Sequence, residues 1–165
     1  MLIRLSNLAL CAVTVSLLAA CGGGDDDPQP SSATALITVT SASLSGQNGV
    51  YGSTSAGLSE VDKVLDGTNL TCVFSFNDLS RAGSAPGTLS GKVSYRENAN
   101  TLSRLEVSVN GAVYASAAVE DSRVDRGSDR ILFGDKVLAS TATGDTSTLV
   151  VNGAVPMRGS RPSGC

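Results

Sequence analysis

The sequence contains no histidine and no tryptophan, and its only aromatic residues are three Phe and three Tyr. Without histidine the chain lacks the commonest general base, the usual serine and cysteine triads, and every zinc site built on imidazole. Six aromatic rings are too few for a platform on which nucleic-acid bases stack, and a net charge of −3 attracts no polyanion. We therefore expect no nucleic-acid partner.

Motifs for catalysis and cofactor binding are also missing. The sequence has no phosphate-binding glycine loop, dinucleotide fingerprint, Cys-x-x-Cys pair or Gly-x-Ser-x-Gly elbow. Ser90-Gly91-Lys92 does not have the Ser-x-x-Lys spacing of penicillin-binding enzymes. We expect no cofactor, no metal and no enzymatic activity.

The first twenty residues have the layout of a secretion signal. Arg4 supplies a positive charge, an apolar run extends from Leu8 to Leu18, and the small residues Ala19 and Ala20 end it. The run is shorter than the ~20 apolar residues that span a bilayer. We predict that residues 1–20 are a cleaved signal peptide.

The segment Leu18-Ala19-Ala20-Cys21 resembles the lipobox of bacterial lipoproteins. The resemblance implies cleavage before Cys21, transfer of diacylglycerol to its thiol, and anchoring in the cell envelope by two or more acyl chains. In such lipoproteins a residue other than Asp after the lipidated cysteine favours the outer membrane over the inner one, and here it is Gly22. The alternative is an ordinary signal peptide cut after Ala20, which leaves Cys21 as a free or disulfide-linked thiol.

Residues 21–32 are predicted to form a lipidated cysteine and a tether, followed by a single all-β domain over residues 33–165. The tether contains no apolar residue larger than proline, and its root-mean-square span is ~17–20 Å. Its run Asp25-Asp26-Asp27 lacks the alternating ligands, glycine turn and distal Glu of a calcium loop. We interpret it as a solvated spacer.

The four cysteines are assigned by elimination. Cys11 leaves with the signal peptide and Cys21 carries the lipid, so Cys72 and Cys165 remain. Two remaining thiols in an oxidising compartment most often bond to each other. We predict a Cys72–Cys165 disulfide that fixes the Pro-, Gly- and Arg-containing tail.

The body alternates apolar and polar residues with period 2, as in Leu70–Asn77 and Leu89–Arg96. This pattern predicts an antiparallel, meander-rich β-barrel or β-sandwich of about 8–10 short strands, and leaves the choice between the two open. Phe74, Phe76 and Tyr95 are expected in its core. The predicted strands are roughly 34–44, 48–53, 60–65, 68–77, 88–96, 102–109, 112–119, 130–133, 136–142 and 147–156. Ser59-Glu60-Val61-Asp62 leaves a helix start as the alternative at 60–65.

Two-residue hairpin turns are predicted at Asp66-Gly67, Asn110-Gly111, Asn152-Gly153 and Gly134-Asp135. Two of these turns lie in identical pentapeptides, Val109–Val113 and Val151–Val155. We interpret this repeat as two similar turns reached independently. Such closely spaced hairpins favour a meander because a two-residue turn cannot connect parallel strands.

Charged side chains offer two candidate sites. Residues 120–130 are predicted to form a charged loop whose Arg123, Arg126 and Arg130 present a polar contact surface. Carboxylate catalysis is the alternative, with Glu60 and Asp62 on one strand face or with the Asp residues of that loop, which are Asp121, Asp125 and Asp129.

The segments Gly49–Thr54 and Val64–Thr68 are similar to a Gly-aromatic opening and a Leu-Asp-Gly hairpin in small proteobacterial lipoproteins. That resemblance implies an envelope protein and brings no reaction with it. The sequence thus predicts a non-catalytic, lipid-anchored envelope protein that binds an unidentified protein or small ligand. The alternatives are a carboxylate-based envelope hydrolase and a periplasmic enzyme inhibitor. An inhibitor requires a rigid loop with an exposed anchor residue, and none is evident in the sequence.

Overall fold

The computed structural model describes residues 34–116 and 119–165, so the predicted signal peptide, Cys21 and tether lie outside the described residues. These residues form eleven β-strands and no helix. The strands are β1 (Ala35–Thr40), β2 (Gly49–Ser53), β3 (Gly57–Leu58), β4 (Asp62–Asp66), β5 (Asn69–Arg81), β6 (Thr88–Arg96), β7 (Thr101–Val109), β8 (Ala112–Ser116), β9 (Val119–Asp125), β10 (Arg130–Ser140) and β11 (Thr148–Pro156). The prediction of an all-β fold is confirmed.

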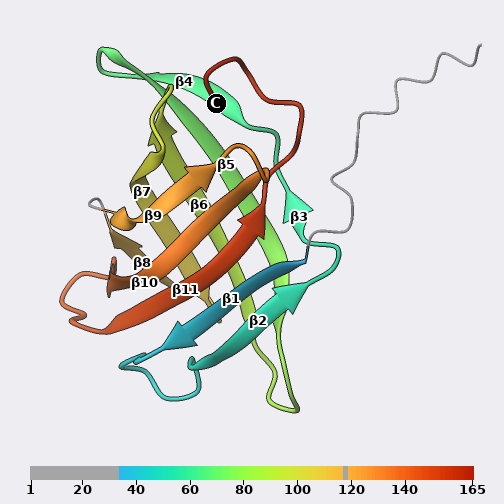
Figure 1. The fold of residues 1–165 in the computed structure, drawn as a ribbon. Coiled ribbons are helices and arrows are strands. Elements are labelled where there is room, and N and C mark those ends of the chain that lie inside the picture. The colour runs from blue at the N-terminus through green and yellow to red at the C-terminus, as the bar shows by residue number, and fades with distance from the viewer. Residues whose placement is uncertain (1–33, 117–118) are drawn as a thin grey trace, which may run out of the picture.

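The strands close into an antiparallel barrel (Figure 1). Hydrogen-bonded neighbours run β11–β1–β2–β5–β6–β7–β8–β10, and β10 pairs again with β11. Strands β8 and β9 both bridge β7 and β10, while β2, β3 and β4 pair with successive parts of the long β5. Because this series of paired strands closes on itself, the fold is a barrel and not an open sandwich. Residues 62–66 form a strand, so the predicted strand is confirmed and the helix alternative is wrong.

The interior of the barrel is filled by aromatic and aliphatic side chains. All six aromatic residues are buried, including Phe74, Phe76 and Tyr95, which confirms the predicted core positions. The ring of Phe76 covers Gly91 on the neighbouring strand, where an added Cβ would lie 2.4 Å from the Phe76 Cζ atom. Glycine is thus required at position 91 because the aromatic ring occupies the space of its side chain.

The predicted charged loop over residues 120–130 is wrong in its first half, which forms β9. Ser122 and Val124 are buried, whereas Asp121 and Arg123 are exposed on the opposite face of the strand. The charged residues at 121 and 123 therefore occupy outward positions, which a strand with one buried face allows. Only residues 126–129 form the turn to β10.

Two of the four predicted hairpins are confirmed. The β4–β5 hairpin turns one residue later than predicted, at Gly67-Thr68, because Asp66 is the last residue of β4 and pairs with Asn69. Asn110-Gly111 connects β7 to β8, as predicted. Asn110 and Gly111 have φ angles of 53° and 85°, the positive values that a type I′ turn requires.

The other two predicted turns are wrong, because both dipeptides lie within continuous strands. Gly134-Asp135 forms an irregularity in β10, where the register to β11 shifts between Phe133 and Lys136. Gly153 lies inside β11, and a Cβ added to it would be 2.1 Å from the carbonyl oxygen of Leu36. Glycine at position 153 therefore permits a close approach of β1 rather than a reversal of the chain.

Candidate functional site

The two ends of the barrel are closed by different segments. We call residues 157–165, which follow β11, the tail cap, and residues 41–48, which connect β1 to β2, the loop plug. In Figure 1 the tail cap is the red segment that curves away from β11 and ends near β4 and β5. The tail cap is held by a disulfide, by hydrogen bonds to its backbone carbonyls and by ion pairs.

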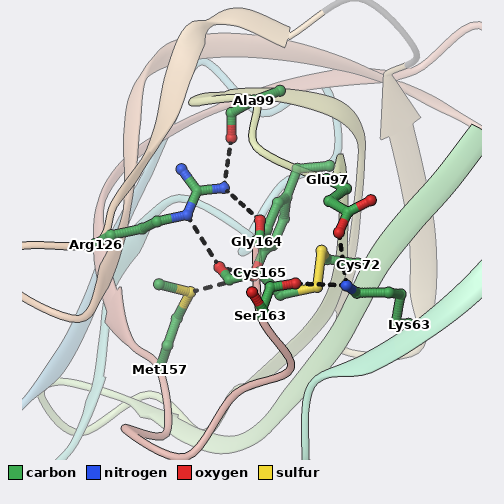
Figure 2. Close-up of a disulfide and its surroundings, with 10 residues drawn as sticks. Lys63, Cys72, Glu97, Ala99, Arg126, Met157, Ser163, Gly164 and Cys165 are labelled. Atoms are coloured by element: carbon green, nitrogen blue, oxygen red, sulfur yellow. Dashed lines mark hydrogen bonds and ion pairs between the residues drawn. A yellow bond between two sulfur atoms is a disulfide. The ribbon is translucent and has the colours of Figure 1, made fainter.

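A disulfide joins the tail cap to β5, as the sequence predicted (Figure 2). Cys72 and Cys165 are bonded over a sequence separation of 93 residues, with their Cα atoms 5.7 Å apart. Both cysteines are buried. The bond therefore holds the tail at the barrel end from a position that solvent does not reach.

Arg126 and Tyr95 hold the last residues of the cap. Tyr95 Oη donates to the carbonyl oxygen of Cys165 at 3.0 Å, and Arg126 Nε donates to the same oxygen at 3.2 Å. Arg126 Nη2 also donates to the carbonyl oxygens of Gly164 at 3.1 Å and Ala99 at 2.8 Å. Burial raises the pKa of the Tyr95 phenol, and the charges of Arg161 and Arg126 oppose this rise. The neutral phenol is thus favoured as a donor.

Ion pairs surround the cap. Lys63 Nζ lies 2.7 Å from Glu97 Oε1 and also donates to the carbonyl oxygen of Ser163 (Figure 2). Two further pairs join tail arginines to acids, Arg158 to Glu60 at 3.0 Å and Arg161 to Asp129 at 2.7 Å. Glu60 and Asp129, two acids considered for catalysis, are therefore engaged by the tail cap.

The remaining candidate acids lie apart from one another. Asp62 is exposed at the start of β4, and Asp121 is exposed on β9. Asp125 accepts hydrogen bonds in the β9–β10 turn, where the hydroxyl and N–H of Ser128 and the N–H of Gly127 lower the pKa of its carboxyl. A carboxyl with a lowered pKa suits turn stabilisation and does not serve as a general acid near neutral pH.

The structure divides the predicted arginine surface. Arg123 is exposed, and with Arg126 it lines an open hollow of ≈ 430 Å³ beside Asn100. Arg126 is only partly exposed and is occupied by the tail cap, whereas Arg130 Nη2 donates to the carbonyl oxygen of Thr34 at 3.0 Å. Of the three, Arg123 alone is exposed, and its role in partner contact stays a prediction.

Gln47 organises the loop plug at the other end of the barrel. Its side-chain Oε1 accepts from Tyr114 Oη at 2.8 Å, and its carbonyl oxygen accepts from Tyr51 Oη at 2.8 Å. Burial raises the pKa of Tyr51, opposed by the charge of Arg81. Sequence reasoning missed Gln47, because a single amide in a polar loop gives no signal that distant tyrosines will meet it.

Residues 34–116 and 119–165 contain no group of three or more metal-binding side chains and no helix of the length and hydropathy needed to cross a membrane. Comparisons with protein-family models, curated proteins and solved structures gave no match.

Proposed function

We propose that the protein is a non-catalytic, lipid-anchored module of the bacterial cell envelope that acts as a binding or interaction protein through its outer surface. The observation that carries this proposal is the buried disulfide between Cys72 and Cys165. Structural disulfides form and persist in oxidising compartments such as the periplasm. This agrees with export by the predicted signal peptide and with lipidation of Cys21, and Gly22 favours the outer membrane.

A non-catalytic role is supported by what the candidate groups already do. Glu60 and Asp129 are paired with arginines, Arg126 binds backbone carbonyls, and Tyr95 donates into the tail cap. The aromatic residues fill the interior, and a segment closes each end. Partner contacts are therefore expected on the outside of the barrel.

Mass spectrometry of the full-length protein, expressed in a bacterium with two membranes and extracted from its envelope, tests the proposal. The expected mature chain begins at Cys21 and carries a diacylglycerol on its thiol. The matched Cys21→Ser variant should remain uncleaved and unlipidated. An unmodified Cys21 thiol, or an intact segment 1–20 on the native protein, would contradict the anchor.

An inhibitor function is the second candidate, favoured by the hairpin of β4 and β5 (Figure 1). Leu65 is 71% exposed there, and its cross-strand partner Leu70 is 41% exposed. Cys72 and Lys63 brace the hairpin through the disulfide and the ion pair to Glu97. This combination provides a rigid loop with an exposed anchor residue.

Assays of lysozymes and envelope proteases with the purified protein test the inhibitor function. Inhibition should be lost with Leu65→Ser and kept with Val137→Ser, a matched change of an exposed aliphatic residue elsewhere. Equal inhibition by both variants, or none by the wild type, counts against this function.

A further inference from the structure

Exposed large apolar side chains gather in two places among the described residues. One group, Val64, Leu65 and Leu70, belongs to the β4–β5 hairpin. The other group lies on β1, β2, β10 and the loop plug, and consists of Leu36, Leu44, Val50 and Val137. The second group lies on or beside a part of the barrel with a distinct composition.

The adjacent strands β11, β1 and β2, which we call the apolar wall, contain no Asp, Glu, Lys or Arg. On their outer face Leu36 is 48% exposed and Val50 is 39% exposed. Leu36 lies between Gly52 of β2 and Ala154 of β11, and Val137 of β10 extends the wall beside Val150. The outer face thus combines aliphatic groups with neutral Thr and Asn side chains, and one carboxylate, Asp135 of β10, lies at its edge and accepts from Asn152 Nδ2 at 2.9 Å.

The polar wall, formed by β5, β6 and β7, differs in both charge and side-chain size. Its outer face carries Lys92 and Glu106 as well as small hydroxyl residues, and an open hollow of ≈ 340 Å³ lies there between Ser75 and Ser108. None of the large exposed apolar residues belongs to β6 or β7. An apolar neighbour therefore fits the apolar wall much better than the polar wall.

The chain enters the barrel at the apolar wall. Thr34 is held against β10 by the hydrogen bond from Arg130, and β1 begins at the next residue. The interval from Cys21 to Thr34 is 13 residues (34 − 21), for which a flexible chain spans ~20 Å. The six residues of β1 cover ~20 Å as well. A lipid on Cys21 therefore keeps the bilayer within reach of this wall.

We propose that the apolar wall lies against the bilayer surface, with Leu36, Val50 and Val137 at the boundary between headgroups and acyl chains. This inference rests on the proposed lipid anchor. Insertion of this wall desolvates no charged residue of β11, β1 or β2. The Thr and Asn side chains, together with the exposed carboxylate of Asp135 that Asn152 binds, remain in the polar headgroup layer. The predicted tether is too polar to cover the wall itself. A stable dimer interface needs ~800 Å² from each partner, which three half-exposed aliphatic side chains do not provide.

Because the chain has no tryptophan, single Trp substitutions report on this arrangement. The variants are Leu36→Trp and Val137→Trp for the apolar wall, Ser108→Trp for the polar wall and Leu65→Trp for the hairpin. Each full-length, processed lipoprotein is placed in vesicles of phosphatidylethanolamine and phosphatidylglycerol with brominated acyl chains, after intact disulfide and β-sheet spectra are verified. An indole inserted by ~5–10 Å lies close enough to the bromines to be quenched.

We expect loss of emission and a shift to shorter wavelength for L36W and V137W, with S108W and L65W unchanged. A protein that carries lipid and floats with the vesicles, but whose L36W variant is not quenched, overturns the inference alone. Quenching of L65W in place of L36W assigns the contact to the hairpin and also overturns it. If the emission of L36W shifts to shorter wavelength without quenching, and the shift grows with the protein-to-lipid ratio, the wall contacts a second copy of the chain and the inference is overturned. Absence of lipid on Cys21 overturns the proposed function together with this inference.

Discussion

The two ends of the barrel are closed by segments that are held in different ways. The loop plug lies between β1 and β2, so two strands hold it, and its buried contacts are hydrogen bonds of Gln47 with two tyrosines. The tail cap follows β11 and leads to no further strand in the described chain; a disulfide and Arg126 hold it. Among the described residues the tail cap is joined to a strand only at residue 156, and the disulfide to β5 supplies a second attachment that lowers the entropy cost of ordering it.

The largest effect is expected from Cys165→Ser. Loss of the disulfide should lower the free energy of unfolding by ~2–5 kcal/mol, because the unfolded chain regains its freedom and the tail cap is released. Denaturant unfolding measures the total, and hydrogen exchange should show faster exchange in residues 157–165 than in the loop plug. Ser163→Ala, a change of an exposed side chain in the same cap that leaves the disulfide intact, is the matched control, with no change expected in the body. Equal acceleration at both ends would contradict a separate role for the tail cap.

The next effect is expected from Arg126→Ala, which removes the charged donor of the Cys165, Gly164 and Ala99 carbonyls. A loss of ~1.5–3 kcal/mol in the free energy of unfolding follows for hydrogen bonds to a charged group. Arg126→Lys should recover only part of it, because an ammonium lacks the planar donor fork. The exposed Arg123→Ala is the control, and a loss as large as that of Arg126→Ala would refute the bracing role.

At the other end, Gln47→Ala should cost ~1–3 kcal/mol, because the buried hydroxyl of Tyr114 loses its acceptor. Tyr114→Phe removes the other member of the pair and should cost less. In the double variant the two losses should not add, since both remove one interaction. Strict additivity in a thermal or denaturant unfolding cycle would show that the hydrogen bond does not stabilise the loop plug.

The smallest effect concerns Asp145 in the β10–β11 turn beside the loop plug. Hydrogen bonds from Ser140 and Ser147 lower the pKa of its carboxyl. A lowered folded-state pKa stabilises the protein above the ordinary Asp value of about 3.9, and this is lost as the pH falls through the folded-state pKa. The Tm difference between wild type and Asp145→Asn should therefore be present at neutral pH and vanish in acid. A difference that persists unchanged in acid would assign the effect to something other than ionisation.

The sequence was informative about local alternation and much less about long-range contacts. Period-2 patterns located most strands. The expectation of an oxidising compartment, in which two remaining thiols form a disulfide, paired Cys72 with Cys165. The identical pentapeptides Val109–Val113 and Val151–Val155 adopt a turn and a strand interior, respectively, because β1 packs closely against Gly153. Tertiary packing decided between the two conformations that Asn-Gly permits.

Only part of the candidate site could be predicted from the sequence. The disulfide followed from counting cysteines, whereas the contacts of Arg126 and Gln47 join residues that are distant in the chain. Charge alone indicated a solvent-facing surface for Arg126, Arg130, Glu60 and Asp129. Their actual partners are backbone carbonyls and tail arginines, which no local pattern specifies.

The pairing of β1 with β11 determines when the barrel can fold relative to the synthesis of the chain. It brings Leu36 beside Ala154, so the barrel cannot close until the residues of β11 have been synthesised. Contacts of such high sequence separation slow folding, because loop closure precedes the favourable pairing. A chain of this topology should therefore stay open during synthesis, which is the state that the proposed export requires.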